Sequence, residues 1–203
     1  FSSVEGVEPQ SETVWHQADK YGVPKLAFVN KMDRVGADFF GTVKMISERL
    51  GANPLVTQIP IGMEDQFIGI IDLIRLKGIV WDEHSLGVGF KEVSIPKEYE
   101  KEAFLYRSKL VESLAELDDR LMEKYLNAEE ISESEMKETL RKATLSLKAV
   151  PVLCGAALRN QGIQPLIDAI VDYLPSPLDT PPIEGTNPVT GEVTSRIAKD
   201  EEP

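Results

Sequence analysis

Two continuous apolar runs are the clearest hydrophobic pattern along the sequence. Residues 26–29 and 150–154 each consist of apolar side chains without polar alternation, as expected for parallel strands buried on both faces. A polar cluster follows the first run and the segment Gly155-Ala156-Ala157 follows the second. In open α/β sheets, ligands bind just beyond the carboxyl ends of such strands.

The other periodicities predict helices and a meander. Apolar residues at helical spacing, with Pro and Gly as start and stop signals, predict helices over about 9–21, 37–50 and 163–174. The residues Phe1-Ser2-Ser3-Val4 are typical of the end of a strand. Short β-like runs separated by Gly- and Asp-containing turns predict an antiparallel meander over 54–95, with runs at 55–59, 67–71, 78–81 and 90–93.

Two more helices are predicted after the meander. The first runs from about 96 to 125, with leucines at helical spacing on one side and acids on the other. The second runs from about 132 to 148 and begins with a capping box of Ser132 and Glu135.

These elements predict an α/β protein with an incomplete parallel sheet and an inserted α+β subdomain. We expect residues 1–51 and 149–175 to form the α/β part and residues 52–148 to form the insertion. The segment 176–203 is rich in Pro and is expected to lead to another domain, with a hairpin near Asn187 to Gly191. We expect the chain to be a piece of a longer protein.

Charge and composition narrow the function classes. Lys and Arg total 22 against 34 Asp and Glu, a net charge of −12, which argues against a protein that coats DNA or other nucleic acid. One cysteine excludes a disulfide framework and a multi-thiolate metal site. No apolar run reaches the roughly 18 residues that a membrane-spanning helix needs, so no membrane partner is expected.

The cluster Asn30-Lys31-Met32-Asp33 has a chemical interpretation. The Asp33 carboxylate can accept parallel hydrogen bonds from the N1–H and exocyclic amine of guanine, a donor pair that adenine lacks. Lys31 can lay its aliphatic stem along the base, and the Asn30 amide can tie the loop to its neighbours. The alternative is an ordinary polar loop in which Asp33 caps the next helix.

The sequence resembles the translational GTPases of the elongation factor G family over essentially its whole length. The resemblance rests on FSSVEGVEPQSETVW (1–15), AFVNKMDR (27–34), LMEKYL (121–126) and YLPSP (173–177). It implies a P-loop-GTPase-type fold that binds GTP or GDP. It also implies that the fourth guanine-nucleotide motif is Asn30, Lys31 and Asp33, and that the fifth is Ala156, Ala157 and Leu158. Ala156 stands where the family usually has Ser, which removes a supporting hydroxyl.

Catalysis cannot be assigned to any residue of this sequence. The P-loop pattern Gly-x-x-x-x-Gly-Lys-Ser/Thr does not occur in it, and neither do the family's switch segments that hold Mg²⁺. The resemblance therefore implies a GTPase only for an intact factor, which couples GTP hydrolysis to translocation of tRNA and mRNA. We expect the piece alone to be inactive.

The acidic helix is a second candidate site. Residues 111–138 hold ten acids and three bases, a net charge of −7. Such runs are often only solvated surface. The resemblance implies contact with the basic end of the ribosomal stalk protein through Glu112, Glu116, Asp119 and Glu123, with ribosomal RNA contacted by the intact factor. It also implies a cytoplasmic or organellar location. The alternatives are a stand-alone acidic docking module and an unrelated α/β enzyme.

Overall fold

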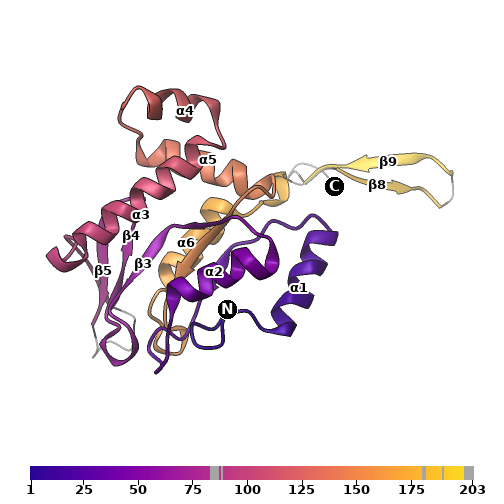
Figure 1. Cartoon of the computed structure of the whole chain (residues 1–203). Coiled ribbons are helices and arrows are strands. Elements are labelled where there is room, and N and C mark those ends of the chain that lie inside the picture. The colour runs from indigo at the N-terminus through magenta and orange to yellow at the C-terminus, as the bar shows by residue number, and fades with distance from the viewer. Residues whose placement is uncertain (83–86, 88, 180–181, 189, 199–203) are drawn as a thin grey trace.

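The computed structural model describes residues 1–82, 87, 89–179, 182–188 and 190–198. Figure 1 shows a parallel sheet with helices α1, α2 and α6 around it, an antiparallel sheet carrying α3, and the short helix α4 at the far end of α3. A two-stranded hairpin extends away from this body near the C-terminus (Figure 1). The predicted α/β class is confirmed.

The parallel sheet has the order β1-β7-β2. Its strands are β1 (Ala27–Val29), β7 (Val150–Cys154) and β2 (Pro54–Val56), and every residue of β7 is buried. The chain start lies beside β1, because Ser2 forms an isolated parallel bridge with Asn30. The sheet thus buries the two apolar runs that predicted it.

Helices α1 (Pro9–Lys20) and α2 (Phe39–Leu50) match the predicted segments closely. The Asp38 side chain caps α2 by accepting the backbone N–H of Gly41 at 2.8 Å, and Gly51 ends it in the left-handed conformation at φ 62°. Phe39 and Ile46 are fully buried, so α2 presents its apolar face to the core.

The antiparallel sheet has the order β3-β4-β5-β6. Its strands are β3 (Gln58–Ile61), β4 (Gly69–Asp72), β5 (Lys77–Trp81) and β6 (Phe90–Val93), with a 3₁₀ turn η1 (Glu64–Gln66) after β3. The meander is confirmed for these strands. The prediction is wrong for residues 54–56, which pair in parallel with β7 instead.

The chain crosses between the two sheets at Thr57. Its backbone N–H donates to the carbonyl of Val152 at 3.1 Å, and its own carbonyl accepts the N–H of Leu73 at 2.9 Å. The domain boundary placed at residue 52 stays a prediction. In the structure, the strands of the parallel sheet extend as far as Val56.

The single helix predicted over 96–125 is wrong, because two helices occupy the segment. Helix α3 (Lys97–Ala115) ends before α4 (Asp119–Leu126) begins, and the Asp118 side chain caps α4 by accepting the N–H groups of Arg120 and Leu121. The predicted leucine stripe still packs inward: Leu110, Leu114 and Leu121 are buried and Leu117 is partly buried.

Helix α5 (Glu133–Leu145) begins with the predicted capping box. Ser132 accepts from the N–H of Glu135, whose carboxylate accepts the Ser132 N–H at 3.0 Å. The helix packs against β7 and α6 (Ile163–Tyr173). It ends three residues earlier than predicted, before Leu147 at φ 62°.

The remaining elements follow β7. They are the 3₁₀ turns η3 (Ala157–Arg159) and η4 (Pro177–Asp179), helix α6, and the hairpin strands β8 (Ile183–Thr186) and β9 (Val193–Arg196). The predicted hairpin is confirmed. On α6, the apolar side chains of Ile167, Ile170 and Val171 are exposed. In the described part of the chain, no helix has the length and apolar character to cross a bilayer.

Candidate functional site

Two loops meet at one edge of the parallel sheet. The first loop, residues 30–33, follows β1, and the second loop, residues 155–159, follows β7, the hydrogen-bonded neighbour of β1. Backbone bonds join them: the N–H of Met32 donates to the Gly155 carbonyl at 3.1 Å and that of Gly155 to the Val29 carbonyl at 3.0 Å. The predicted polar cluster and the Gly-Ala-Ala segment therefore lie together, as the parallel order requires.

Asn30 links the two loops through its side chain. Its Oδ1 accepts the backbone N–H of Lys31 at 2.8 Å and that of Ala157 at 2.9 Å. The role predicted for its amide, tying the loop to its neighbours, is therefore confirmed. The side chain sets the spacing between the first and second loops.

Lys31 adopts a left-handed backbone conformation, with φ at 67°. Non-glycine residues rarely do so, and the strain persists only where neighbours hold the backbone in place. The Ser3 hydroxyl provides such a hold by donating to the Lys31 carbonyl at 2.9 Å. The Lys31 side chain is half-exposed, and its Nζ lies 3.3 Å from a carboxylate oxygen of Glu5.

Asp33 is not a helix cap. The cap of α2 is Asp38, so the helix-capping role that the alternative interpretation gave to Asp33 is wrong. The Asp33 side chain is only 12% exposed, and its Oδ2 lies 3.0 Å from Nε of Arg159. This ion pair is a second link between the loops, and the sequence analysis missed Arg159. No sequence signal distinguishes Arg159 from other surface cations, because its partner lies in the other loop.

The second loop is tightly built. A Cβ added to Gly155 would lie 2.3 Å from the Gln161 carbonyl oxygen, so the backbones approach too closely for a side chain. Ala156 is buried, whereas Leu158 is 96% exposed. The side-chain Oε1 of Gln161 is buried and has no hydrogen-bond partner within the described residues.

Two of the three backbone N–H groups of residues 156–158 already have partners in the structure. The Ala156 N–H donates to the Gln161 carbonyl at 2.9 Å, and the Ala157 N–H is taken by Asn30. The first of these donors is used by the turn that follows β7, and the second by the contact between the two loops. Of the three groups, only the N–H of Leu158 has no hydrogen bond to another described residue.

A hollow of about 410 Å³ lies beside the first loop. It is lined by Val4, Glu5, Lys31, Asp33, Arg34 and Val35. A larger cleft of about 530 Å³ lies elsewhere, between the start of α2 and the start of α3, and is lined by four acids. The hollow at the loops is the one that contains the predicted base-reading residues Lys31 and Asp33.

The predicted acidic residues lie on two helices. Glu112 is in α3, Glu116 is the residue that ends it, and Asp119 and Glu123 are in α4. All four side chains are exposed, and none forms an ion pair with another described residue. We call these four residues the acidic surface.

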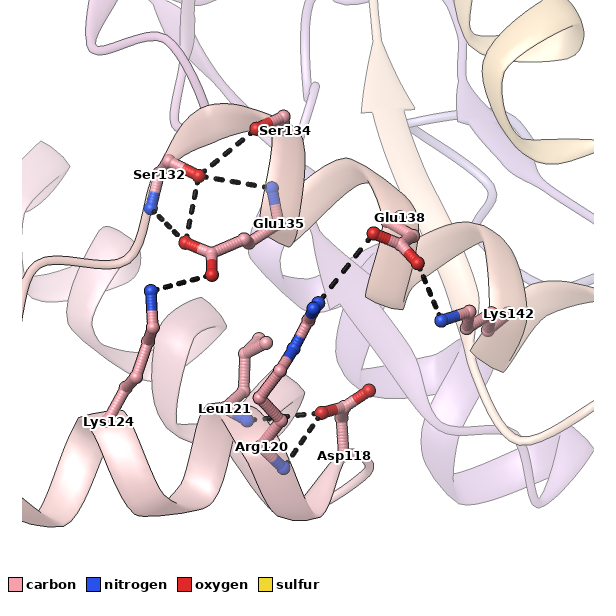
Figure 2. A network of polar contacts seen from close by, with 9 residues as sticks. All are labelled: Asp118, Arg120, Leu121, Lys124, Ser132, Ser134, Glu135, Glu138 and Lys142. Atoms are coloured by element: carbon pink, nitrogen blue, oxygen red, sulfur yellow. Dashed lines mark hydrogen bonds and ion pairs between the residues drawn. The ribbon is translucent and has the colours of Figure 1, made fainter.

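The three basic residues of segment 111–138 form ion pairs with acids outside the acidic surface. Figure 2 shows Lys124 of α4 against Glu135, and Arg120 against Glu138, which also contacts Lys142. The Lys124–Glu135 distance is 2.6 Å, and this contact, with two hydrogen bonds from Ser132, lowers the pKa of Glu135 to about 2. The third base, Lys137, pairs with Glu133 and Asp172. Arg120 and Lys124 therefore link α4 to α5, and Lys137 links α5 to α6. None of the three pairs with the acidic surface in the described part of the chain.

Within residues 1–82, 87, 89–179, 182–188 and 190–198, no group of three or more His, Cys, Asp or Glu side chains is placed to hold a metal ion. The lone cysteine, Cys154, is fully buried in β7, and burial raises the pKa of its thiol. We assign no metal or nucleophilic chemistry to these residues.

Comparison with known proteins gives three findings. Residues 1–176 match the family described as the elongation factor Tu GTP binding domain. The chain is 56% identical over its 203 residues to Elongation factor G 2 of Syntrophus aciditrophicus (strain SB), and it spans 30% of the length of that relative. A crystal structure of a protein from Thermus thermophilus superposes with a TM-score of 0.78 at 25% identity, covering 96% of this chain and 30% of that one.

Proposed function

The chain belongs to the family of the elongation factor Tu GTP binding domain, and from this premise we propose that it reads the guanine base for a ribosomal translocase GTPase. The intact factor would be an elongation factor G, which couples GTP hydrolysis to movement of tRNA and mRNA. Its place of action would be the cytoplasm. The single observation that carries the proposal is the junction of the first and second loops at the sheet edge.

The chemistry of this junction suits guanine. The two oxygens of Asp33 can accept the N1–H and the 2-amino group together, and the uncommitted N–H of Leu158 can donate to O6. Lys31 can cover one face of the base with its methylenes. Adenine offers no such donor pair, so it cannot make the two hydrogen bonds to the mostly buried carboxylate that guanine can make.

Hydrolysis belongs to parts that this sequence does not contain. The phosphate-binding pattern Gly-x-x-x-x-Gly-Lys-Ser/Thr is missing from the 203 residues. The Mg²⁺ of the intact factor would supply charge neutralisation at the phosphates, and no residue of the described chain is assigned to hold it. We propose that the chain by itself binds GTP or GDP weakly through the base and does not turn GTP over.

The test is a titration of the ¹⁵N-labelled chain with guanosine monophosphate (GMP) and with adenosine monophosphate (AMP). We expect GMP to shift the backbone amides of residues 30–34 and 157–159, with AMP producing a much smaller change at equal concentration. The two ligands share the phosphate, so their difference reports base recognition alone. Equal responses to both would contradict the proposal.

A second function is favoured by the acidic surface, whose four exposed carboxylates have no cationic partner within the described chain. We propose that it docks a basic protein domain, with the ribosomal stalk protein as the partner. Charges of this kind set the encounter rate more than the affinity. A stand-alone docking module would bind this partner without any preference for guanine.

The docking proposal is tested by charge reversal. We expect Glu112→Lys with Glu116→Lys to slow association with the stalk's globular domain at low salt, and the slowing to shrink as salt rises. The matched control is Glu184→Lys with Glu192→Lys, which makes the same charge change on the exposed hairpin. Equal stopped-flow rates for the two double variants would contradict the proposal.

A further inference from the structure

Arg159 holds the carboxylate on which the guanine proposal depends. Its Nε lies 3.0 Å from Oδ2 of Asp33, and the two residues come from the second and first loops. The Asp33 side chain is 12% exposed, whereas that of Arg159 is 55% exposed. Arg159 is the only cation paired with Asp33 within the described chain, and it contacts Oδ2, one of the two oxygens that a guanine base would use.

The guanidinium group and the guanine edge present similar donors. Both are planar, and both carry N–H groups on a shared carbon in the spacing that matches two carboxylate oxygens. A mostly buried carboxylate without a donor is costly, and Arg159 supplies a donor while the site is empty. A base that uses both oxygens of Asp33 therefore competes with the guanidinium group for Oδ2.

Displacement requires movement of the side chain only. The Arg159 backbone is fixed, because its N–H donates to the Ala156 carbonyl at 2.9 Å and the next residue, Asn160, closes the turn in the left-handed conformation at φ 55°. The side chain projects from this anchor and is more than half exposed, so it can leave Asp33 without disturbing the second loop.

We infer that Arg159 is a built-in competitor of the guanine base, which occupies Asp33 in the empty site and lowers the apparent selectivity for guanine. This inference rests on the proposed guanine-reading function. Because the pair is partly exposed, its competition is modest: pairs of this kind contribute about 0.2–1 kcal/mol, equivalent to roughly 1.4- to fivefold in binding.

The experiment measures the ratio of GMP to AMP affinity by titration of the ¹⁵N-labelled chain. We expect Arg159→Ala to raise this ratio by roughly 1.4- to fivefold at low salt, and the gain to fall as salt screens the pair in the parent chain. Arg159→Lys keeps the charge but loses the planar donor pair, so we expect an intermediate ratio. The shared phosphate cancels any general effect of removing a cation.

The matched control is Arg120→Ala. The Arg120 side chain is also 55% exposed and also paired with an acid, Glu138, but it lies on α4. The ratio of GMP to AMP affinity in the Arg120→Ala variant should equal that of the parent chain. Each variant's amide spectrum outside the substituted region reports whether the fold is kept.

The outcomes separate this inference from the function on which it rests. A parent chain that binds GMP and AMP equally contradicts the guanine-reading proposal and removes the basis of the inference. A parent chain that prefers GMP, with a ratio unchanged or lowered by Arg159→Ala, contradicts the inference alone. A lowered ratio would show that Arg159 positions Asp33 for the base instead of competing with it.

Discussion

Asn30 and Ala157, 127 residues apart in the sequence, are joined by a hydrogen bond of 2.9 Å from the Ala157 N–H to the Asn30 side-chain oxygen. The same oxygen accepts the N–H of Lys31. One amide group therefore fixes the first loop internally and against the second. The relative placement of the two loops, and with it the proposed base site, depends on this contact.

Removing the Asn30 side chain should loosen the second loop. We expect Asn30→Ala to lower the free energy of unfolding by about 1–3 kcal/mol, because two N–H groups lose their acceptor. The Ala157 amide should exchange with solvent faster, as measured by hydrogen exchange. Asn30→Asp keeps an acceptor oxygen and should retain most of the protection. Equal exchange in the Ala variant and the parent chain would contradict the assigned link.

Changing Asp33 to Asn should alter the preferred base. An amide presents one acceptor and one donor, which matches the N1–H and 2-oxo groups of xanthine in place of the two donors of guanine. We expect Asp33→Asn to weaken binding of GMP by at least about tenfold and to favour xanthosine monophosphate. Competition titrations measure the order of affinities. A variant that still prefers GMP would place base reading elsewhere.

Gly155 should not tolerate a side chain. In Gly155→Ala the new Cβ would lie 2.3 Å from the Gln161 oxygen and 2.7 Å from the Phe28 ring. We expect the free energy of unfolding to fall by about 1–3 kcal/mol in urea denaturation, since backbone has to move. Gly185→Ala is the control, because an added Cβ meets nothing within 4 Å there. Similar losses in both variants would count against the steric explanation.

Capping by Asp118 should stabilise α4. We expect Asp118→Ala to lower the free energy of unfolding by about 0.5–2 kcal/mol, because the N–H groups of Arg120 and Leu121 lose their acceptor. Asp119→Ala removes a neighbouring carboxylate that is exposed and does not cap the helix, and should cost less. Urea denaturation compares the two variants, and the reverse order would refute the cap.

The α4–α5 contact should depend on acid pH. Lys124, and then Ser132, lower the pKa of Glu135 from 4.5 to about 2. A carboxyl with a lowered pKa in the folded state stabilises the protein above its unfolded pKa, and this stabilisation is lost as pH falls from about 4.5 to about 2. Glu135→Gln should show a shallower loss of stability in that window. Parallel curves for the parent chain and the variant would rule the contribution out.

Elements with strong local signals were predictable. The run Val150–Cys154 coincides with β7, because a continuous apolar stretch suits a strand buried on both faces. The capping box at Ser132 likewise specifies its own helix start. The break at Asp118 was not predictable in the same way, since the capping acid is one of ten acids in an acidic segment and periodicity continues across it.

Features that depend on distant partners escaped prediction. Residues 54–56 look like the first strand of the meander, but their hydrogen-bonding partner is β7, far along the chain. At the candidate site, the spacing of the motif indicated Asn30 and Asp33. The Arg159–Asp33 contact and the use of the Ala157 N–H by Asn30 arise only when the two loops meet.

The pairing of β2 with β7 limits how this region can be shortened by evolution or by deletion. The strands are parallel neighbours, so the segment between them leaves at one end of the sheet and returns at the other. Parallel neighbours need a crossover of a dozen or more residues, usually including a helix, and a tight turn cannot replace it. A viable shortened version would keep a returning helix such as α5, which packs directly on β7.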